Sequence, residues 1–114
     1  MGRFVKGDIV IMPFPFSDLS ASKKRPALVV ASLAGDDVIL CQITSQPIRD
    51  RYALAIEKKY FATGGLNRPS NVRPNRLFTA DSSLLLYRAG GLSPEKTDMV
   101  INVLGCWDGA EITN

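Results

Sequence analysis

Short apolar runs separated by turn residues dominate most of the chain before residue 81. Runs of this length that are rich in β-branched residues are typical of strands rather than helices. Six such runs are predicted to be strands: 9–12, 26–31, 38–43, 52–56, 70–73 and 76–80. Gly35 lies between the second and third runs and indicates a hairpin with a short turn. Pro74 separates the last two runs, and a proline is expected to interrupt a strand there.

The C-terminal part of the chain changes to a helical pattern. Ser93-Pro94-Glu95 combines a serine cap, a proline at the first helical position and an acidic first turn, which together predict a helix start. An apolar stripe follows at three- and four-residue spacing: Met99, Val100, Val103, Leu104 and Trp107. We expect this stripe to pack across the mouth of the folded sheet, and a share in a dimer contact is the alternative. Residues 63–66 are expected to form a turn or loop, and residues 82–87 a helical turn closed by Gly90-Gly91.

Many short strands with no helical period between them predict a mainly β fold, a small partly open barrel with a C-terminal α-helix. The length of 114 residues fits one domain over 1–114 with a single hydrophobic core. Hydrophobic residues make up 46% and charged residues 22%, which is the balance of an ordinary globular protein rather than a disordered one.

Three consecutive cations, Lys23, Lys24 and Arg25, stand directly before the predicted strand 26–31. Pro26 biases Arg25 toward an extended backbone. A guanidinium held at the root of a rigid strand presents a planar fork of donors that suits phosphate oxygens. The alternative is a solvated basic turn that leads into a core strand.

The net charge of +3 is modest, but the cations are clustered. The clusters are 23–25, Arg49 with Arg51, and Arg68 with Arg73 and Arg76. A fold that brings them together makes a surface for a polyanion, with nucleic acid as the first candidate. Scattered solubilising charges are the alternative.

The chain contains no histidine, which excludes Ser-His-Asp and Cys-His catalysis and most zinc sites. Cys41 and Cys106 have no motif spacing and are expected to be buried free thiols, with neither a disulfide nor a metal role. We expect no metal and no cofactor.

The apolar runs are too short to span a bilayer and no signal peptide is recognised, so a cytoplasmic protein without a membrane partner is expected.

Hydroxyl side chains follow the third predicted strand at Thr44 and Ser45. Arg25 opens its strand and Thr44 closes the next, so antiparallel pairing places both at one end of the sheet. Arg73 and Asn75, at the break between the fifth and sixth strands, are expected at the same rim.

Three segments resemble the MazF/PemK family of toxin endoribonucleases: GDIVIMPFPFSDLSASKKRPALVV, ITS and SNVRPNRLFTAD. The Gly-Leu-Ser-Pro-Glu helix start is also similar to the PemK-like branch. The resemblance implies an SH3-like barrel with a C-terminal helix and a homodimer. It further implies metal-independent, sequence-specific cleavage of single-stranded RNA, and a cognate antitoxin protein that blocks the RNA site.

Carried over to this sequence, the resemblance implies that Arg25 and Thr44 are catalytic. Phe16, at the entrance of the loop before the basic triplet, is a candidate base-stacking residue. The full set of expected RNA contacts is Phe16, Ser17, Lys23, Lys24, Ser45, Gln46, Arg73 and Asn75. In PemK-like members an Arg and an Asp two residues later are proposed as acid and base. Arg73 fits this pattern, but Asn75 replaces the Asp and cannot act as a base. Either the protein uses Arg25 and Thr44, or its activity is reduced, or its substrate choice differs.

Two other functions are compatible with a small basic barrel. One is a non-catalytic toxin of the same fold, similar to the gyrase poison CcdB, although that branch lacks the RP and ITS motifs. The other is a non-enzymatic module that binds nucleic acid or protein.

Overall fold

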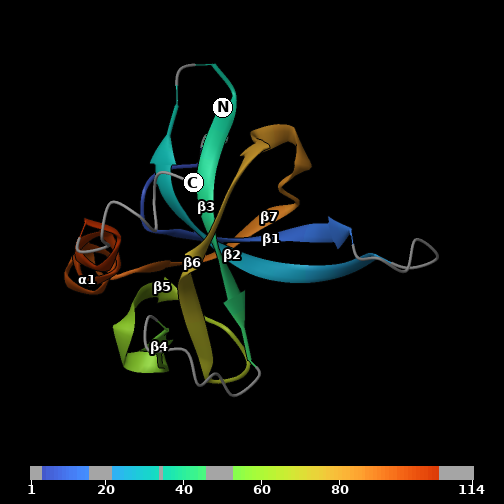
Figure 1. Ribbon diagram of the computed structural model, residues 1–114. Helices are drawn as coiled ribbons and strands as arrows, with labels where there is room; N and C mark the ends of the chain where they lie inside the picture. Colours follow the sequence, from blue (N-terminus) through green and yellow to red (C-terminus); the bar gives the residue numbers. More distant parts are fainter. Residues whose placement is uncertain (1–3, 16–21, 34, 46–52, 106–114) are drawn as a thin grey trace.

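The computed structural model describes residues 4–15, 22–33, 35–45 and 53–105. These residues form one strongly curved seven-stranded sheet with the strand order β4-β6-β3-β2-β1-β7-β5 and one helix beside it (Figure 1). The strands are β1 Asp8–Pro15, β2 Ser22–Ser32, β3 Asp37–Thr44, β4 Leu54–Ile56, β5 Phe61–Gly64, β6 Ser70–Asp81 and β7 Tyr87–Leu92. The 3-10 turns are η1 Lys58–Tyr60 and η2 Ser82–Leu84, and the helix is α1 Pro94–Gly105.

The predicted mainly β, partly open barrel with a C-terminal helix is confirmed. β4 and β5 are the two edge strands of the sheet, and no pairing joins them among the described residues. They follow each other in the chain and are connected through η1. The barrel is therefore open along a seam between β4 and β5.

The prediction of two separate strands around Pro74 is wrong, because β6 runs through it. Cys41 of β3 pairs with Leu77 while the next residue, Gln42, pairs with Arg73. The intervening residues of β6 are looped out as a bulge, so the proline occupies a position where no ladder donor is needed.

β7 lies where a helical turn and a glycine pair were predicted. Only Ser82–Leu84 adopt a helical turn, and the chain then returns as a strand between β1 and β5. A Cβ atom on Gly90 would lie 2.5 Å from the Thr63 carbonyl oxygen, so the glycine permits close approach of β5. Residues 87–92 form a strand because they pair with β1 and β5, and not because of their own strand propensity. The predicted turn at 63–66 is likewise partly strand, because β5 extends to Gly64.

Two hydrophobic clusters line the two faces of the sheet. The first contains Ile9, Leu28 and Ile43, and α1 adds Val100 to it. The second contains Val10, Met12, Ala27, Val29, Val38, Leu40, Ala80 and Leu85. Alternate residues of each strand enter opposite clusters, as the pleat of a strand requires.

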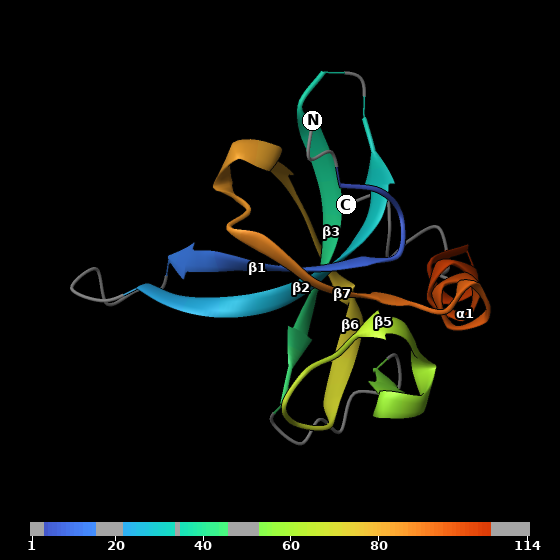
Figure 2. The same cartoon turned by 180° about the vertical axis from the view of Figure 1, so that it is seen from behind.

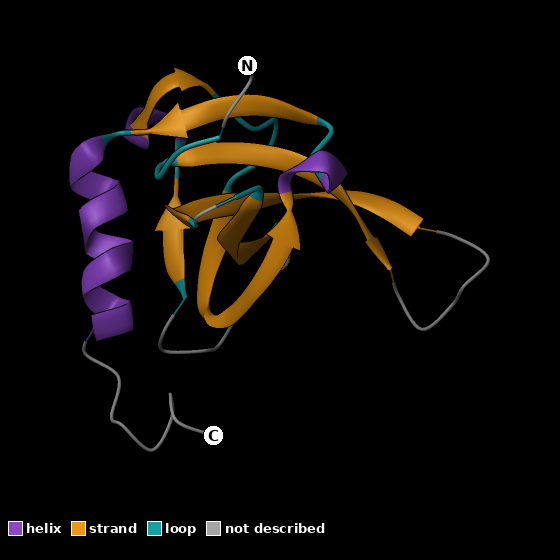
Figure 3. Cartoon of the chain, turned by 90° about the horizontal axis from the view of Figure 1, so that it is seen from above, coloured by secondary structure: helices purple, strands orange, loops and turns teal. Residues whose placement is uncertain are grey.

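The helix stands at one end of the sheet (Figure 3). The predicted serine cap is confirmed, because the Ser93 Oγ accepts a hydrogen bond from the Lys96 backbone N–H at 3.2 Å. Ile101 and Leu104 also pack against the first cluster, whereas Met99 is 48% exposed and does not belong to the buried stripe. Trp107 lies outside the described residues. No helix within the described ranges is long and apolar enough to cross a membrane.

The sheet divides into two arms (Figures 1 and 2). β2 pairs with β3 only as far as Ala27 opposite Gln42. Beyond that point β2 stays with β1 as far as Ser22 opposite Pro15, and β3 stays with β6 as far as Thr44 opposite Asn71. Pro26 lies where the arms separate and has no N–H group to donate to a ladder.

Gly64 is constrained by both its conformation and its surroundings. Its φ is 63°, and a Cβ atom there would lie 2.2 Å from the Ala89 carbonyl oxygen. We expect Gly64→Ala to lower the free energy of unfolding by at least about 1–3 kcal/mol, measured by denaturant titration. The matched control is Gly65→Ala, because a Cβ at Gly65 meets nothing within 4 Å. Equal losses in the two variants would contradict the close β5–β7 approach.

Cys41 is fully buried, which confirms the prediction for this thiol, and Cys106 lies outside the described residues. Burial raises the pKa of the Cys41 thiol to about 12. In a Cys106→Ser variant we expect a maleimide to leave the native protein unlabelled at pH 8 and to label it after unfolding. Because the pKa of the Cys41 thiol is raised in the folded state, the free energy of unfolding keeps its full value below about pH 9. It decreases as the pH rises toward 12, since the unfolded chain then releases the thiol proton more readily than the folded one. Rapid native labelling would contradict the burial.

Candidate nucleic-acid site

A hollow of about 490 Å³ lies in the fork between the two arms of the sheet. β2 supplies one wall and the end of β3 supplies another, while the segment that precedes β6 closes the third side. The lining residues are Lys24, Arg25, Pro26, Ile43, Thr44, Ser45, Leu66, Asn67, Arg68 and Ser70. This hollow is called the fork hollow below.

The structure brings Arg25 and Thr44 to the walls of this one hollow, at the same end of the sheet. Arg25 is half-buried and stands opposite the buried Met12 of β1. Thr44 is only 8% exposed, since it ends a strand that is paired with β6. Lys24 and Ser45 are exposed at the rim. The core strand on which Arg25 stands fixes its position, because the residues 27–29 that follow are fully buried.

Arg73 lies on β6 beside the end of β3, and its expected RNA contact remains a prediction. Its backbone pairs with Gln42, next to the bulge of β6, and its side chain is half-buried. Among the described residues that line the fork hollow, Arg73 does not appear. Phe16, Ser17 and Gln46 lie outside the described residues, and so do the side chains of Lys23 and Asn75, so the expectations for these five remain predictions.

The sequence reasoning missed Asn67, Arg68 and Ser70 as site residues. The Ser70 hydroxyl donates a hydrogen bond to the Arg68 carbonyl oxygen at 3.0 Å, and Ser70 itself pairs with Ile56 of β4. These contacts hold the backbone before β6 against the sheet, so Arg68 is presented from an anchored segment. The only signal in the sequence was the grouping of Arg68 with two other arginines.

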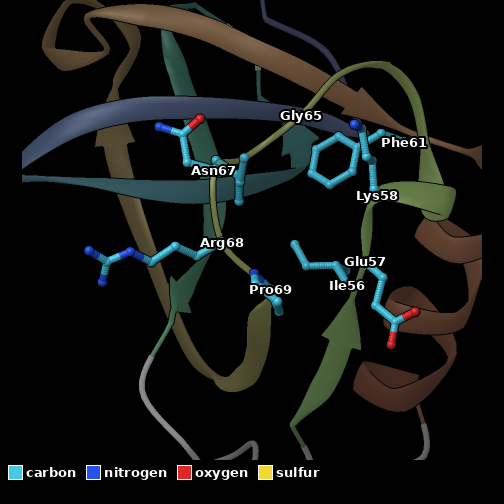
Figure 4. A pocket seen from close by; sticks show the side chains of 9 residues that line it. Ile56, Glu57, Lys58, Phe61, Gly65, Asn67, Arg68 and Pro69 are labelled. Atoms are coloured by element: carbon cyan, nitrogen blue, oxygen red, sulfur yellow. The ribbon is translucent and has the colours of Figure 1, made fainter.

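A second hollow, of about 550 Å³, lies at the open seam of the barrel (Figure 4). Its residues come from the end of β4, from η1, from β5 and from the segment before β6. They are Ile56, Glu57, Lys58, Phe61, Gly65, Leu66, Asn67, Arg68 and Pro69. This seam hollow shares Leu66, Asn67 and Arg68 with the fork hollow, so the two hollows lie on either side of one segment.

The charge of the fork hollow favours an anion. Lys24, Arg25 and Arg68 are cationic, and none of the described lining residues is acidic. Within the described part of the chain, no group of three His, Cys, Asp or Glu side chains is placed to hold a metal ion. Guanidinium, ammonium and hydroxyl groups around one hollow are the donors that bind a phosphodiester.

A family model described as the PemK-like, MazF-like toxin of type II toxin–antitoxin systems matches residues 5–106. The match covers most of the chain, and the protein therefore belongs to this family. No match was found among the curated proteins.

Several solved structures share the fold at low sequence identity. The MazF of Deinococcus radiodurans (Form-I) has 17% identity and a TM-score of 0.71, covering 98% of each chain. The Mycobacterium tuberculosis toxin MazF-mt6 has 19% identity and a TM-score of 0.67, covering 93% of this chain and 96% of its own. An endoribonuclease in complex with its cognate antitoxin, from a mycobacterial species, has 12% identity and a TM-score of 0.67, covering 96% and 95%.

Proposed function

We propose that this protein is a cytoplasmic endoribonuclease that cleaves single-stranded RNA in a sequence-specific manner, without a metal, as the toxin of a type II toxin–antitoxin pair. The observation that carries the proposal is the convergence of Arg25 and Thr44 on a cationic hollow. Membership of the toxin family and the likeness to solved endoribonucleases support it.

The reaction needs few groups from the protein, since RNA carries its own nucleophile. The 2′-hydroxyl beside the scissile phosphate attacks phosphorus and gives up its proton to solvent, while the bond to the 5′ oxygen breaks and that oxygen gains a proton. The products are a 2′,3′-cyclic phosphate and a 5′-hydroxyl. The protein holds the backbone in line for attack and stabilises the added negative charge of the transition state.

Arg25 is suited to stabilising this charge, because its guanidinium donates two parallel charge-assisted hydrogen bonds. Thr44, at the adjacent strand end, is suited to holding a phosphate oxygen or the attacking hydroxyl. Lys24 and Ser45 would contact the flanking backbone from the rim. Arg73 and Asn75 would act on RNA from the neighbouring strand β6 rather than as an acid–base pair, since an amide is not a base.

The proposal includes two protein partners. A cognate antitoxin would cover the RNA site. Two solved structures of the same fold support this partner: a mycobacterial endoribonuclease in complex with its cognate antitoxin, and MazE-MazF from Deinococcus radiodurans. A homodimer is the proposed functional unit.

Arg25→Ala should slow cleavage of a long RNA by about 10²–10³-fold, since loss of one such donor raises the free energy of the transition state by about 2.7–4 kcal/mol. Cleavage is measured in EDTA, with the cut ends mapped for a cyclic phosphate and a 5′-hydroxyl. Arg25→Lys should restore little activity, because an ammonium cannot reproduce the planar fork.

The matched control is Arg76→Ala, which removes an exposed arginine that lines neither hollow. Undiminished cleavage by a folded Arg25→Ala protein would refute the role of Arg25. Intact RNA with the wild-type protein, accompanied by gyrase poisoning, would support the non-catalytic toxin instead.

RNA affinity should fall as salt is added. Binding releases cations condensed on the phosphates, and this release is less favourable when the solution already contains more salt. The log–log slope is about −0.7 for each phosphate contacted on a single strand. If Lys24, Arg25 and Arg68 each contact one phosphate, the total slope is about −2. The measurement is fluorescence anisotropy with an uncleavable RNA across a salt series. Binding that does not respond to salt would rule out a phosphate-contacting hollow.

A further inference from the structure

The seam hollow differs in chemistry from the fork hollow. Its apolar lining comes from Ile56, Phe61, Leu66 and Pro69, and its polar and charged lining comes from Glu57, Lys58, Asn67 and Arg68. Figure 4 shows the ring of Phe61 facing the space above Ile56, while the carboxylate of Glu57 turns away from it. The ring of Phe61 offers its flat face to a nucleobase, and the described lining of the fork hollow contains no aromatic ring.

The two hollows are connected through a single segment. In Figure 4, Asn67 and Arg68 extend away from Phe61, on the opposite side of their backbone from the ring. Both residues also line the fork hollow, so the Arg68 guanidinium is available to the backbone of an RNA held there. A strand whose phosphate lies at Arg68 has the seam hollow directly beside it.

We propose that the seam hollow receives one unstacked nucleobase of the RNA, stacked on Phe61, while Arg68 holds the phosphate that joins this nucleotide to the scissile region. This inference rests on the proposed function. The occupant is a base of the same RNA, since the hollow shares three residues with the candidate site. The charge of Arg68 suits the polyanion.

A base held in the seam hollow would help the RNA backbone to reach the geometry that cleavage needs. In-line attack needs the backbone splayed on both sides of the scissile bond, so a base withdrawn into the seam hollow would hold the strand in that form. Phe61 and Arg68 are therefore positioning residues for the substrate and do not touch the reacting atoms.

The test is an abasic scan of a short single-stranded RNA that carries a 2′-deoxy nucleotide at the mapped cleavage position. Affinity is measured by anisotropy as the base is removed from one position at a time. For the wild-type protein, we expect removal at one position near the cleavage point to weaken binding by about 5- to 20-fold, the lower part of the range for a stacked base.

Phe61→Leu should weaken binding of the intact RNA by a similar factor and should no longer respond to the missing base at that position. Phe61→Tyr keeps the ring and should behave as wild type in both assays. Tyr87→Leu is the matched control, because it removes an aromatic side chain that is 55% exposed and lines neither hollow. A response to the abasic position that persists in Phe61→Leu would overturn the inference.

Phe61 also packs against the first hydrophobic cluster, so Phe61→Leu changes the core as well as the seam hollow. A second variant, at the exposed Arg68, tests the inference without changing the core. Arg68→Gln should weaken RNA binding and make the salt slope less negative by about 0.7, which is the loss of one phosphate contact. Lys59→Gln is its control, because Lys59 lies beside Tyr60 and lines neither hollow. An unchanged slope in Arg68→Gln would also overturn the inference.

The outcomes separate this inference from the proposed function. If the wild-type protein cleaves RNA in EDTA and the Phe61 and Arg68 variants match their controls, the base in the seam hollow and the phosphate contact of Arg68 are excluded, while the proposed roles of Arg25 and Thr44 stand. If the wild-type protein neither cleaves nor binds RNA, the proposed function fails and the inference fails with it. If Phe61→Leu weakens binding of the antitoxin but leaves RNA binding unchanged, the hollow is a protein-binding site and the inference is wrong.

Discussion

The structure depends on the point where β2 and β3 stop pairing. Up to Ala27 and Gln42 the two strands share a ladder, and on either side of that ladder lie the two hydrophobic clusters. Beyond it each strand keeps its other partner, β1 or β6. A sheet that divides in this way exposes the end of two core strands without exposing the core. The side chains at the fork are therefore rigidly supported and accessible at the same time.

The segment before β6 gives this fork its third wall. It follows the edge strand β5 and leads into β6, so residues 66–68 lie between the open seam and the fork. The openness of the barrel thus has a function in the proposed scheme, since a closed barrel would pair β4 with β5 and leave no room for the seam hollow. In the proposed scheme the scissile phosphate and the unstacked base lie on the two sides of one short stretch of backbone.

The sequence predicted the strands whose residues are β-branched and buried, and it predicted the helix from its cap. It failed at Tyr87–Leu92, because two glycines and an arginine give that segment little strand propensity and only its neighbours β1 and β5 make it a strand. Pro74 misled the prediction of β6, since a bulge several residues wide is set by pairing with β3. Arg25 and Thr44 were recognisable because each adjoins a core strand. Arg68 was not, because an exposed arginine before a strand looks the same whether it faces RNA or only water.

The long-range pairing of β1 with β7 has a consequence for how the molecule comes into being. The buried carboxylate of Asp8 accepts a hydrogen bond from the Arg88 side chain at 2.8 Å, across eighty positions of sequence. During translation β1 and β2 leave the ribosome long before β7, so the free side of β1 stays uncovered until residue 92 has emerged. The sheet is therefore complete only after β7 has emerged and paired with β1.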